Sequence, residues 1–307
     1  MKRVVITDWG FPSLEPENDV FRGRGIDLQA HQCKTEDDVV RVVGDADVVM
    51  AQWAPVRAKA IGAMKRCRGI VRYGIGLDNI DLEAARKRGI AVRNVPDYCL
   101  DEVADHTIGL MLALQRQIMT VAERVKRGTW SITPPLNLPP LRASKLGLVG
   151  FGRIARLVAQ RAAAFGMSIL AFDPGVAQRD ILDARVQPVS FDDLLTSSDI
   201  ISLHCPLNDA TRHLIGRSAL ARMKSQALVV NTSRGGLVDL DALVVTLRDG
   251  RIAGAGLDVF ETEPLPPNHA FLSLPNALAT SHIAWFSTAS IGQLQRRAAL
   301  QALNLLQ

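Results

Sequence analysis

The sequence predicts an α/β protein made of two doubly wound parallel-sheet domains. Short apolar runs alternate with segments of helical period, which is the βαβ rhythm of a parallel sheet with helices on both faces. The chain has 307 residues, and roughly 150 residues per domain favours two domains. The rhythm stops at a proline-rich segment, residues 133–140, and then starts again.

The first half of the chain has four apolar runs that we predict to be strands, at residues 4–6, 47–50, 69–73 and 90–92. The segments between them have helical periodicity. One carries the apolar pairs at 39–40 and 42–43, and another runs from Leu82 to Arg88 and ends at Gly89, a typical helix stop. This half therefore predicts a complete α/β sheet of its own.

A longer helix is predicted from about Val103 to Gln117, with apolar residues nearly all round. Such a helix is expected to be buried between domains or between subunits. Four prolines within residues 133–140 predict a connecting loop. Strands are then predicted at 145–149, 168–172, 228–230 and 277–280, and a last helix from about Thr288.

The composition excludes several classes of protein. Apolar residues make up 48% and charged residues 22%, which is ordinary for a globular protein rather than a collagen-like or disordered one. The net charge is +5, and short basic clusters such as 65–68 and 86–88 fit helix ends, so no nucleic-acid partner is expected. No run approaches the roughly 20 apolar residues of a membrane span. The four cysteines fit neither a zinc site nor a disulfide framework, so we expect no metal and a cytoplasmic location.

The strongest local motif is a glycine loop with Gly150, Gly152 and the small residue Ala155. It lies between a predicted strand and a helix that begins near Arg153, whose free N–H groups would bind a pyrophosphate. Asp173 ends the next predicted strand, 21 residues after Gly152, where a carboxylate binds ribose hydroxyls. Because a carboxylate repels a ribose phosphate, we predict NAD rather than NADP as the cofactor.

Seven further motifs occur in order along the chain, at residues 73–81, 95–97, 102–105, 204–207, 231–236, 257–264 and 282–285. Together with the glycine loop they resemble the D-isomer-specific 2-hydroxyacid dehydrogenases over essentially the whole chain. Arg72 and Trp285 resemble the substrate pocket of one branch, the C-terminal binding proteins and their bacterial enzyme relatives.

This resemblance implies a particular division of the chain. A flavodoxin-like substrate-binding domain would comprise residues 1–98 plus 288–307, and a Rossmann cofactor domain, residues 99–287, would be inserted into it. A cleft is expected between the two domains. The resemblance also implies a homodimer formed through the cofactor domain.

The expected chemistry centres on His282, which follows the apolar run 277–280 and so lies at a strand end, where α/β proteins bind ligands. By resemblance, His282 is the catalytic acid/base and Glu263 its partner, since a carboxylate favours the protonated imidazole. Residue type alone leaves Glu261 as a rival for that role. Arg234 would bind the substrate carboxylate and polarise the ketone, because its planar guanidinium matches both.

The resemblance assigns the other site residues. Asp258 would bind the nicotinamide amide, and Trp285 would favour a larger substrate side chain over glyoxylate. The predicted cofactor-binding residues are Gly150, Gly152, Arg153, Ile154, Asp173, His204, Cys205, Pro206, Thr211, Thr232 and Asp258. The predicted substrate-binding residues are Arg72, Tyr73, Gly74, Ile75, Gly76 and Trp285.

We therefore predict an NAD-dependent D-2-hydroxyacid dehydrogenase, a 2-keto acid reductase that transfers hydride between nicotinamide and a small 2-keto or 2-hydroxy acid. The alternative is an NAD(H)-sensing, co-repressor-like binding protein in which the same site is vestigial. A formate or phosphite dehydrogenase is a weaker alternative, because Arg72 and the Glu263–His282 pair suit a 2-keto acid better.

Overall fold

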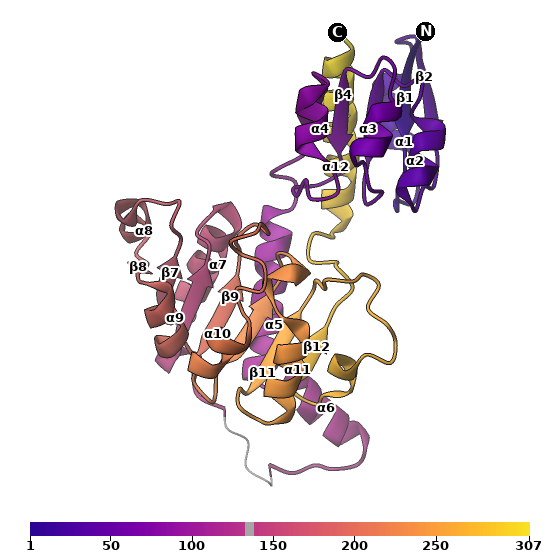
Figure 1. The fold of residues 1–307 in the computed structure, drawn as a ribbon. Coiled ribbons are helices and arrows are strands. Elements are labelled where there is room, and N and C mark those ends of the chain that lie inside the picture. The colour runs from indigo at the N-terminus through magenta and orange to yellow at the C-terminus, as the bar shows by residue number, and fades with distance from the viewer. Residues whose placement is uncertain (133–137) are drawn as a thin grey trace. The chain divides into compact units, whose positions relative to one another are not determined.

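A computed structural model describes residues 1–132 and 138–307, which form two units (Figure 1). The first unit is Met1–Cys99 with Phe286–Gln307, and the second is Leu100–Trp285. The predicted boundaries at 98/99 and 287/288 differ from these by one and two residues. Each unit contains one parallel sheet with helices, which confirms the predicted fold class. The predicted proline-rich loop falls largely on residues 133–137, outside the described residues.

The first unit is built on a five-stranded parallel sheet with strand order β2-β1-β3-β4-β5. This is the order of flavodoxin-like folds, which bind ligands at the carboxyl ends of the strands. The strands are β1 (Lys2–Ile6), β2 (Ile26–Ala30), β3 (Val48–Ala51), β4 (Gly69–Arg72) and β5 (Ala91–Arg93). The helices are α1 (Glu15–Phe21), α2 (Glu36–Val42), α3 (Ala58–Ala63), α4 (Leu82–Lys87) and α12 (Thr288–Leu306).

The last helix belongs to the first unit, where α12 packs against α1, β3 and β4. It begins at a capping box, in which Ser287 and Ser290 each accept from the other's backbone N–H. The four strands predicted in this half are present, but β2 and α1 were not predicted. The sequence of β2 mixes polar and apolar residues, and it is an edge strand that is nowhere fully buried, so it carries little apolar signal.

The second unit is built on a seven-stranded parallel sheet with strand order β12-β11-β10-β9-β6-β7-β8. Counted within the unit, its first six strands have the Rossmann order 3-2-1-4-5-6. The strands are β6 (Lys145–Val149), β7 (Ser168–Phe172), β8 (Gln187–Pro188), β9 (Ile200–Leu203), β10 (Leu228–Asn231), β11 (Gly254–Leu257) and β12 (Ala277–Ala279). The helices are α5 (Leu100–Gln115), α6 (Ile118–Lys126), α7 (Arg153–Ala164), α8 (Gln178–Asp183), α9 (Phe191–Ser197), α10 (Arg217–Arg222) and α11 (Leu240–Arg248), with short 3₁₀ turns η1 (Leu141–Ala143), η2 (Gly235–Leu237) and η3 (Ala270–Ser273).

Two apolar cores cover the faces of this sheet. One contains side chains of α9, α10 and α11, and the other contains side chains of α5, α7 and α8. Gly254 and Gly256 on β11 let α5 approach closely, because a Cβ on Gly256 would lie 3.1 Å from the Leu114 side chain. Packing on the sheet and on α7 within its own unit accounts for the buried side chains of α5, and burial between domains or between subunits stays a prediction.

The helix after α5 was not predicted. None of the residues of α6 is buried, and its apolar side chains Ile118 and Met119 are half exposed. Among the helices of the described residues, none has both the length and the hydropathy needed to cross a bilayer.

Candidate active site

The predicted site residues of the second unit gather at the carboxyl edge of its sheet. Gly150 follows β6, Asp173 follows β7 and His204 follows β9, while Arg234, Asp258 and His282 follow β10, β11 and β12. Since the strands are parallel, these ends share one edge, which is where such sheets bind ligands.

The glycine loop has the geometry that a dinucleotide needs. Gly150 has φ +89°, and a Cβ there would lie 2.7 Å from the backbone nitrogen of Cys205. Gly152 is the N-cap of α7, has open space where a side chain would be, and offers no side-chain cap to the helix. The first N–H groups of α7, which begin at Arg153 and Ile154, are thus left for a bound anion. The loop therefore fits the pyrophosphate of NAD.

Asp173 connects the glycine loop to the end of β7. Its Oδ2 accepts a hydrogen bond from the Phe151 N–H at 2.8 Å, and its Oδ1 accepts one from the Gly175 N–H at 2.8 Å. Each carboxylate oxygen has further acceptor capacity. The residue is therefore fixed at the strand end where the ribose contact was predicted.

The loop after β9 carries the other residues predicted to line the adenine side. The pKa of His204 is lowered to about 4 by burial, so its imidazole is neutral at neutral pH. Burial raises the pKa of the Cys205 thiol to about 11, which keeps it protonated. The hydroxyl of Thr211 donates to the Pro206 carbonyl at 2.7 Å and closes this loop. None of these groups is poised for acid–base chemistry.

The predicted catalytic pair is formed in the structure. Nδ1 of His282 lies 2.7 Å from Oε2 of Glu263, and the Phe260 N–H donates to Oε1 of Glu263 at 2.8 Å. With the carboxylate facing Nδ1, the proton on that nitrogen is held and Nε2 is the atom left for a substrate. Both side chains keep about a third of their surface exposed, at 30% and 35%.

The rival acid has different partners. Glu261 is ion-paired with Arg212, and its Oε2 lies 3.2 Å from Nε2 of His213. The two acids of this loop thus point to separate neighbours, although they are two residues apart. Geometry selects Glu263 as the partner of His282, a choice that residue type could not make.

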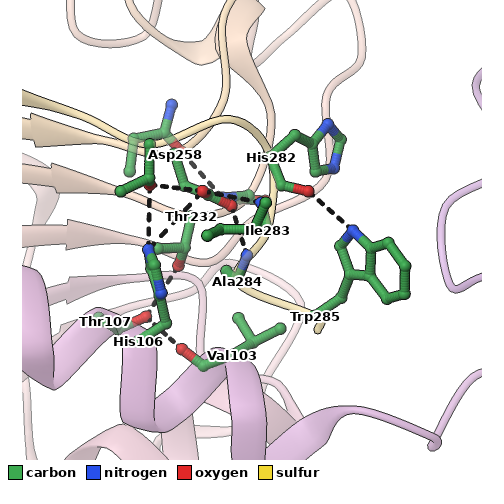
Figure 2. Close-up of polar contacts among 12 residues, drawn as sticks. Val103, His106, Thr107, Thr232, Asp258, His282, Ile283, Ala284 and Trp285 are labelled. Carbon is green, nitrogen blue, oxygen red and sulfur yellow. Dashed lines mark hydrogen bonds and ion pairs between the residues drawn. The ribbon is translucent and has the colours of Figure 1, made fainter. Parts of the chain in front are cut away.

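Asp258 holds the turn that carries His282 (Figure 2). The N–H of Ile283 donates to its Oδ1 at 3.0 Å and the N–H of Ala284 donates to its Oδ2 at 2.9 Å, while its backbone carbonyl accepts from the His282 N–H at 2.8 Å. His282 adopts φ +56°, an uncommon conformation for a residue other than glycine. These three hydrogen bonds hold His282 in that conformation and offset its strain.

The Asp258 carboxylate also contacts two residues that we did not predict as part of the site, Thr280 and His106. The Thr280 hydroxyl donates to Oδ1 of Asp258 at 2.5 Å, and Nε2 of His106 on α5 lies 3.0 Å from that hydroxyl. The same His106 nitrogen lies 3.6 Å from Oδ1 of Asp258 (Figure 2). Asp258 is 1% exposed. Its structural role is thus to anchor the 280–284 segment, and the contact with nicotinamide stays a prediction.

Thr107, next to His106, is a second residue that we missed. Its hydroxyl lies 2.8 Å from that of Thr232, a predicted cofactor residue, and donates to the Val103 carbonyl (Figure 2). The sequence signal was available, since both residues directly follow the motif at 102–105.

The side chain and the backbone of Arg234 are each held by a hydrogen bond. Its Nη1 donates to the Ser233 carbonyl at 2.7 Å, and the amide of buried Asn231 donates to the Arg234 carbonyl at 2.8 Å. The next residue, Gly235, is pressed against the loop of Glu263, because a Cβ there would lie 1.9 Å from the Phe260 carbonyl carbon. Gly235 therefore allows close packing on this loop, while Gly236 allows close packing on the Leu207 side chain.

In the first unit, the predicted substrate loop follows β4. Gly74 has φ +138°, and the Arg72 guanidinium covers it so closely that a Cβ would lie 1.5 Å from Nη1. No protein acceptor within the described residues receives the N–H groups of Ile75 and Gly76. The side chain of Tyr73, by contrast, is 1% exposed and turned into the core, so it does not face a ligand as we predicted.

Trp285 is held close to His282. Its indole Nε1 donates to the backbone carbonyl of His282 at 2.7 Å (Figure 2). The imidazole of His282 points away from the Asp258 carboxylate in the same view. The indole is therefore fixed relative to His282, as a residue that shapes a pocket must be.

Comparison with known proteins gives consistent matches. The model of the NAD-binding domain of D-isomer specific 2-hydroxyacid dehydrogenases matches residues 108–284, more than half of the chain. A hydroxypyruvate reductase of Thermotoga maritima is 41% identical over 269 residues, which cover 87% of this chain and 85% of the relative. A glyoxylate reductase of Thermofilum pendens is 38% identical over 293 residues, which cover 91% and 84%.

The fold has equally clear counterparts among solved structures. The D-lactate dehydrogenase of Aquifex aeolicus, solved with NAD and lactic acid, matches with a TM-score of 0.91 at 28% identity, covering 99% of this chain and 95% of that one. A glyoxylate reductase from Paecilomyes thermophila matches with a TM-score of 0.87 at 30% identity, covering 99% and 93%.

Proposed function

The chain belongs to the D-isomer-specific 2-hydroxyacid dehydrogenase family, and we propose that it reduces short 2-keto acids such as glyoxylate and hydroxypyruvate. It is an NAD-dependent oxidoreductase that acts on the CH–OH group of a 2-hydroxy acid. Its relatives are named as enzymes, which favours this function over the co-repressor-like binding protein.

One observation carries the proposed chemistry, namely the 2.7 Å contact between Nδ1 of His282 and Glu263. When bound, NADH would supply the hydride for the keto carbon. In the same reaction, Nε2 of His282 gives a proton to the keto oxygen, and Glu263 stabilises the imidazolium from the Nδ1 side. In the oxidation of a hydroxy acid, Nε2 takes that proton back.

Substrate binding is proposed to use arginine and backbone groups. In the second unit, the Arg234 guanidinium binds the substrate carboxylate and polarises the neighbouring ketone. In the first unit, the N–H groups of Ile75 and Gly76 are proposed to bind a carboxylate group, and Arg72 adds positive charge beside them. NAD would be held by the glycine loop at Gly150–Ile154, by Asp173 and by the loop after β9.

The choice of short keto acids comes from the names of the relatives, while the resemblance of Arg72 and Trp285 to the C-terminal binding protein-like branch predicts a larger side chain. The branch therefore stays a prediction. NADH consumption with glyoxylate, hydroxypyruvate, phenylpyruvate and 4-methylthio-2-oxobutyrate separates the two. A kcat/KM that falls with side-chain length supports our proposal, and a preference for the last two would contradict it.

We also propose a homodimer formed through the second unit. The supporting surface, which we call the α6 surface, carries five exposed apolar side chains, Ile118, Met119, Val125, Trp130 and Ile132. Their exposed fractions range from 40% to 89%, and all five lie within residues 118–132, so this segment exposes more large apolar side chains than a monomer usually does. A cytoplasmic location stays a prediction from the cysteine pattern.

A further inference from the structure

A buried carboxyl group in the first unit lies outside the machinery described so far. Glu17 on α1 has no exposed surface. The Tyr73 hydroxyl donates to its Oε1 at 2.9 Å, and the Gln295 amide donates to its Oε2 at 2.9 Å. One carboxyl group therefore connects three separate segments, namely α1, the end of β4 and α12.

Burying this carboxyl group costs free energy. Burial raises the pKa of Glu17, since the charged form loses its water. Removing one donor would leave a buried carboxylate oxygen unsatisfied, which is strongly unfavourable. Apolar side chains of similar volume could fill the same space at little cost. Stability alone thus does not explain a glutamate at this position.

The residue that donates to Glu17, Tyr73, lies directly next to the proposed substrate loop. Tyr73 precedes Gly74, and besides its hydroxyl contact its ring packs at 5.2 Å against Phe11, while its N–H donates to the Ala51 carbonyl at 2.9 Å. The segment directly after β5 holds the loop with two further hydrogen bonds, from the Asn94 amide to the Ile75 carbonyl at 2.6 Å and from the Val95 N–H to the Gly74 carbonyl at 3.1 Å.

We propose that Glu17 is a positioning residue that fixes Tyr73, and through it the Gly74–Gly76 loop, in the geometry that binds the substrate carboxylate. This inference rests on the proposed function of that loop. Gln295 connects α12 to the same contact, because its amide also donates to the Ser13 carbonyl at 2.8 Å, shortly before the start of α1. The loop is then positioned by a polar contact that has one geometry, whereas an apolar contact would permit several.

The test uses the whole chain with NADH and with glyoxylate and hydroxypyruvate as probes. Tyr73→Phe removes one hydroxyl and keeps the ring. The triple variant Glu17→Met, Tyr73→Phe, Gln295→Met replaces the whole polar contact with side chains of similar volume, so that it folds even if Tyr73→Phe alone does not. Glu15→Gln is the matched control, since Glu15 lies on the same helix but is exposed.

We expect KM for the keto acid to rise at least about tenfold in the triple variant, because a displaced loop binds the carboxylate less well. The kcat should stay within about threefold and the Kd of NADH should be unchanged, as for a lost binding contact. Glu15→Gln should match wild type. A triple variant that melts near the wild-type temperature and has wild-type KM would overturn the role of Glu17 alone. A wild-type protein inactive on both keto acids would overturn the proposed function and this inference with it.

Discussion

At the scale of single residues, the site separates two acids that the sequence places side by side. Glu263 contacts His282, whereas Glu261 is paired with Arg212 and His213. The loop conformation, rather than residue chemistry, gives the two carboxylates different environments. Their roles can therefore be separated by the same conservative substitution at each position.

We predict that Glu263→Gln lowers kcat at least about tenfold, because the imidazolium of His282 loses its carboxylate. Glu261→Gln should leave kcat within about threefold of wild type, since its partners lie away from His282. Steady-state NADH consumption with hydroxypyruvate measures both. Equal losses in the two variants would show that the loop, and not the contact with His282, is what matters.

His204 gives a prediction for stability against pH. Burial lowers its folded pKa to about 4, below its ordinary value of 6.5. Between these two pH values the unfolded chain binds more protons, so this contribution to stability is present above pH 6.5 and is lost as the pH falls toward 4. Urea unfolding at several pH values should show a smaller loss for His204→Gln than for wild type. Identical pH slopes would refute this.

At the scale of elements, the turn after β12 depends on the end of β11. Asp258 binds the N–H groups of Ile283 and Ala284 with its two oxygens, and an asparagine has one acceptor oxygen for both. We predict that Asp258→Asn lowers kcat while the Kd of NADH changes by less than about threefold. A large rise in that Kd with unchanged kcat would instead favour the nicotinamide contact that the resemblance implies.

The α6 surface gives a second prediction at this scale. Replacing Met119 and Trp130 together with lysine should convert a dimer into a monomer in sedimentation velocity, because charges would be buried at the interface. Leu182→Lys is the control, since Leu182 is also an exposed apolar residue of the second unit, at 57%, but lies on α8. A double variant that sediments like wild type would exclude this surface as the interface.

The elements that the sequence revealed are those with the clearest physical signal. Strands β1, β3 and β10 are buried apolar runs, and each was predicted close to its observed bounds. Edge strand β2 and exposed helix α6 were not predicted, because neither buries enough apolar surface to create a regular pattern. Strands β9 and β11 were not predicted either, although both are buried. For α5, the apolar pattern shows that a helix is buried but not what covers it, and the structure adds its packing on the sheet and on α7.

The site was predictable in its residue types and in the Glu263–His282 pair, but not in its other contacts. The resemblance supplied Arg234, Glu263 and His282. The Asp258 contacts of Thr280 and His106, and the buried orientation of Tyr73, depend on which face of the backbone each side chain leaves. Sequence spacing does not encode that direction outside regular strands and helices.

At the scale of the whole molecule, both units repeat one design, a parallel sheet whose carboxyl edge carries the proposed functional groups. The first unit presents the backbone N–H groups of the Gly74–Gly76 loop, and the second presents a cofactor loop and a histidine–carboxylate pair. The proposed function depends on His282 acting on the substrate rather than on NADH.

The most direct test is His282→Asn, measured in two ways on the same preparation. We predict that kcat with hydroxypyruvate falls by about 10²- to 10⁴-fold, the usual contribution of a general acid, while the Kd of NADH from its fluorescence stays within about threefold. A variant that keeps near wild-type turnover would contradict our central claim, because another group would then be delivering the proton.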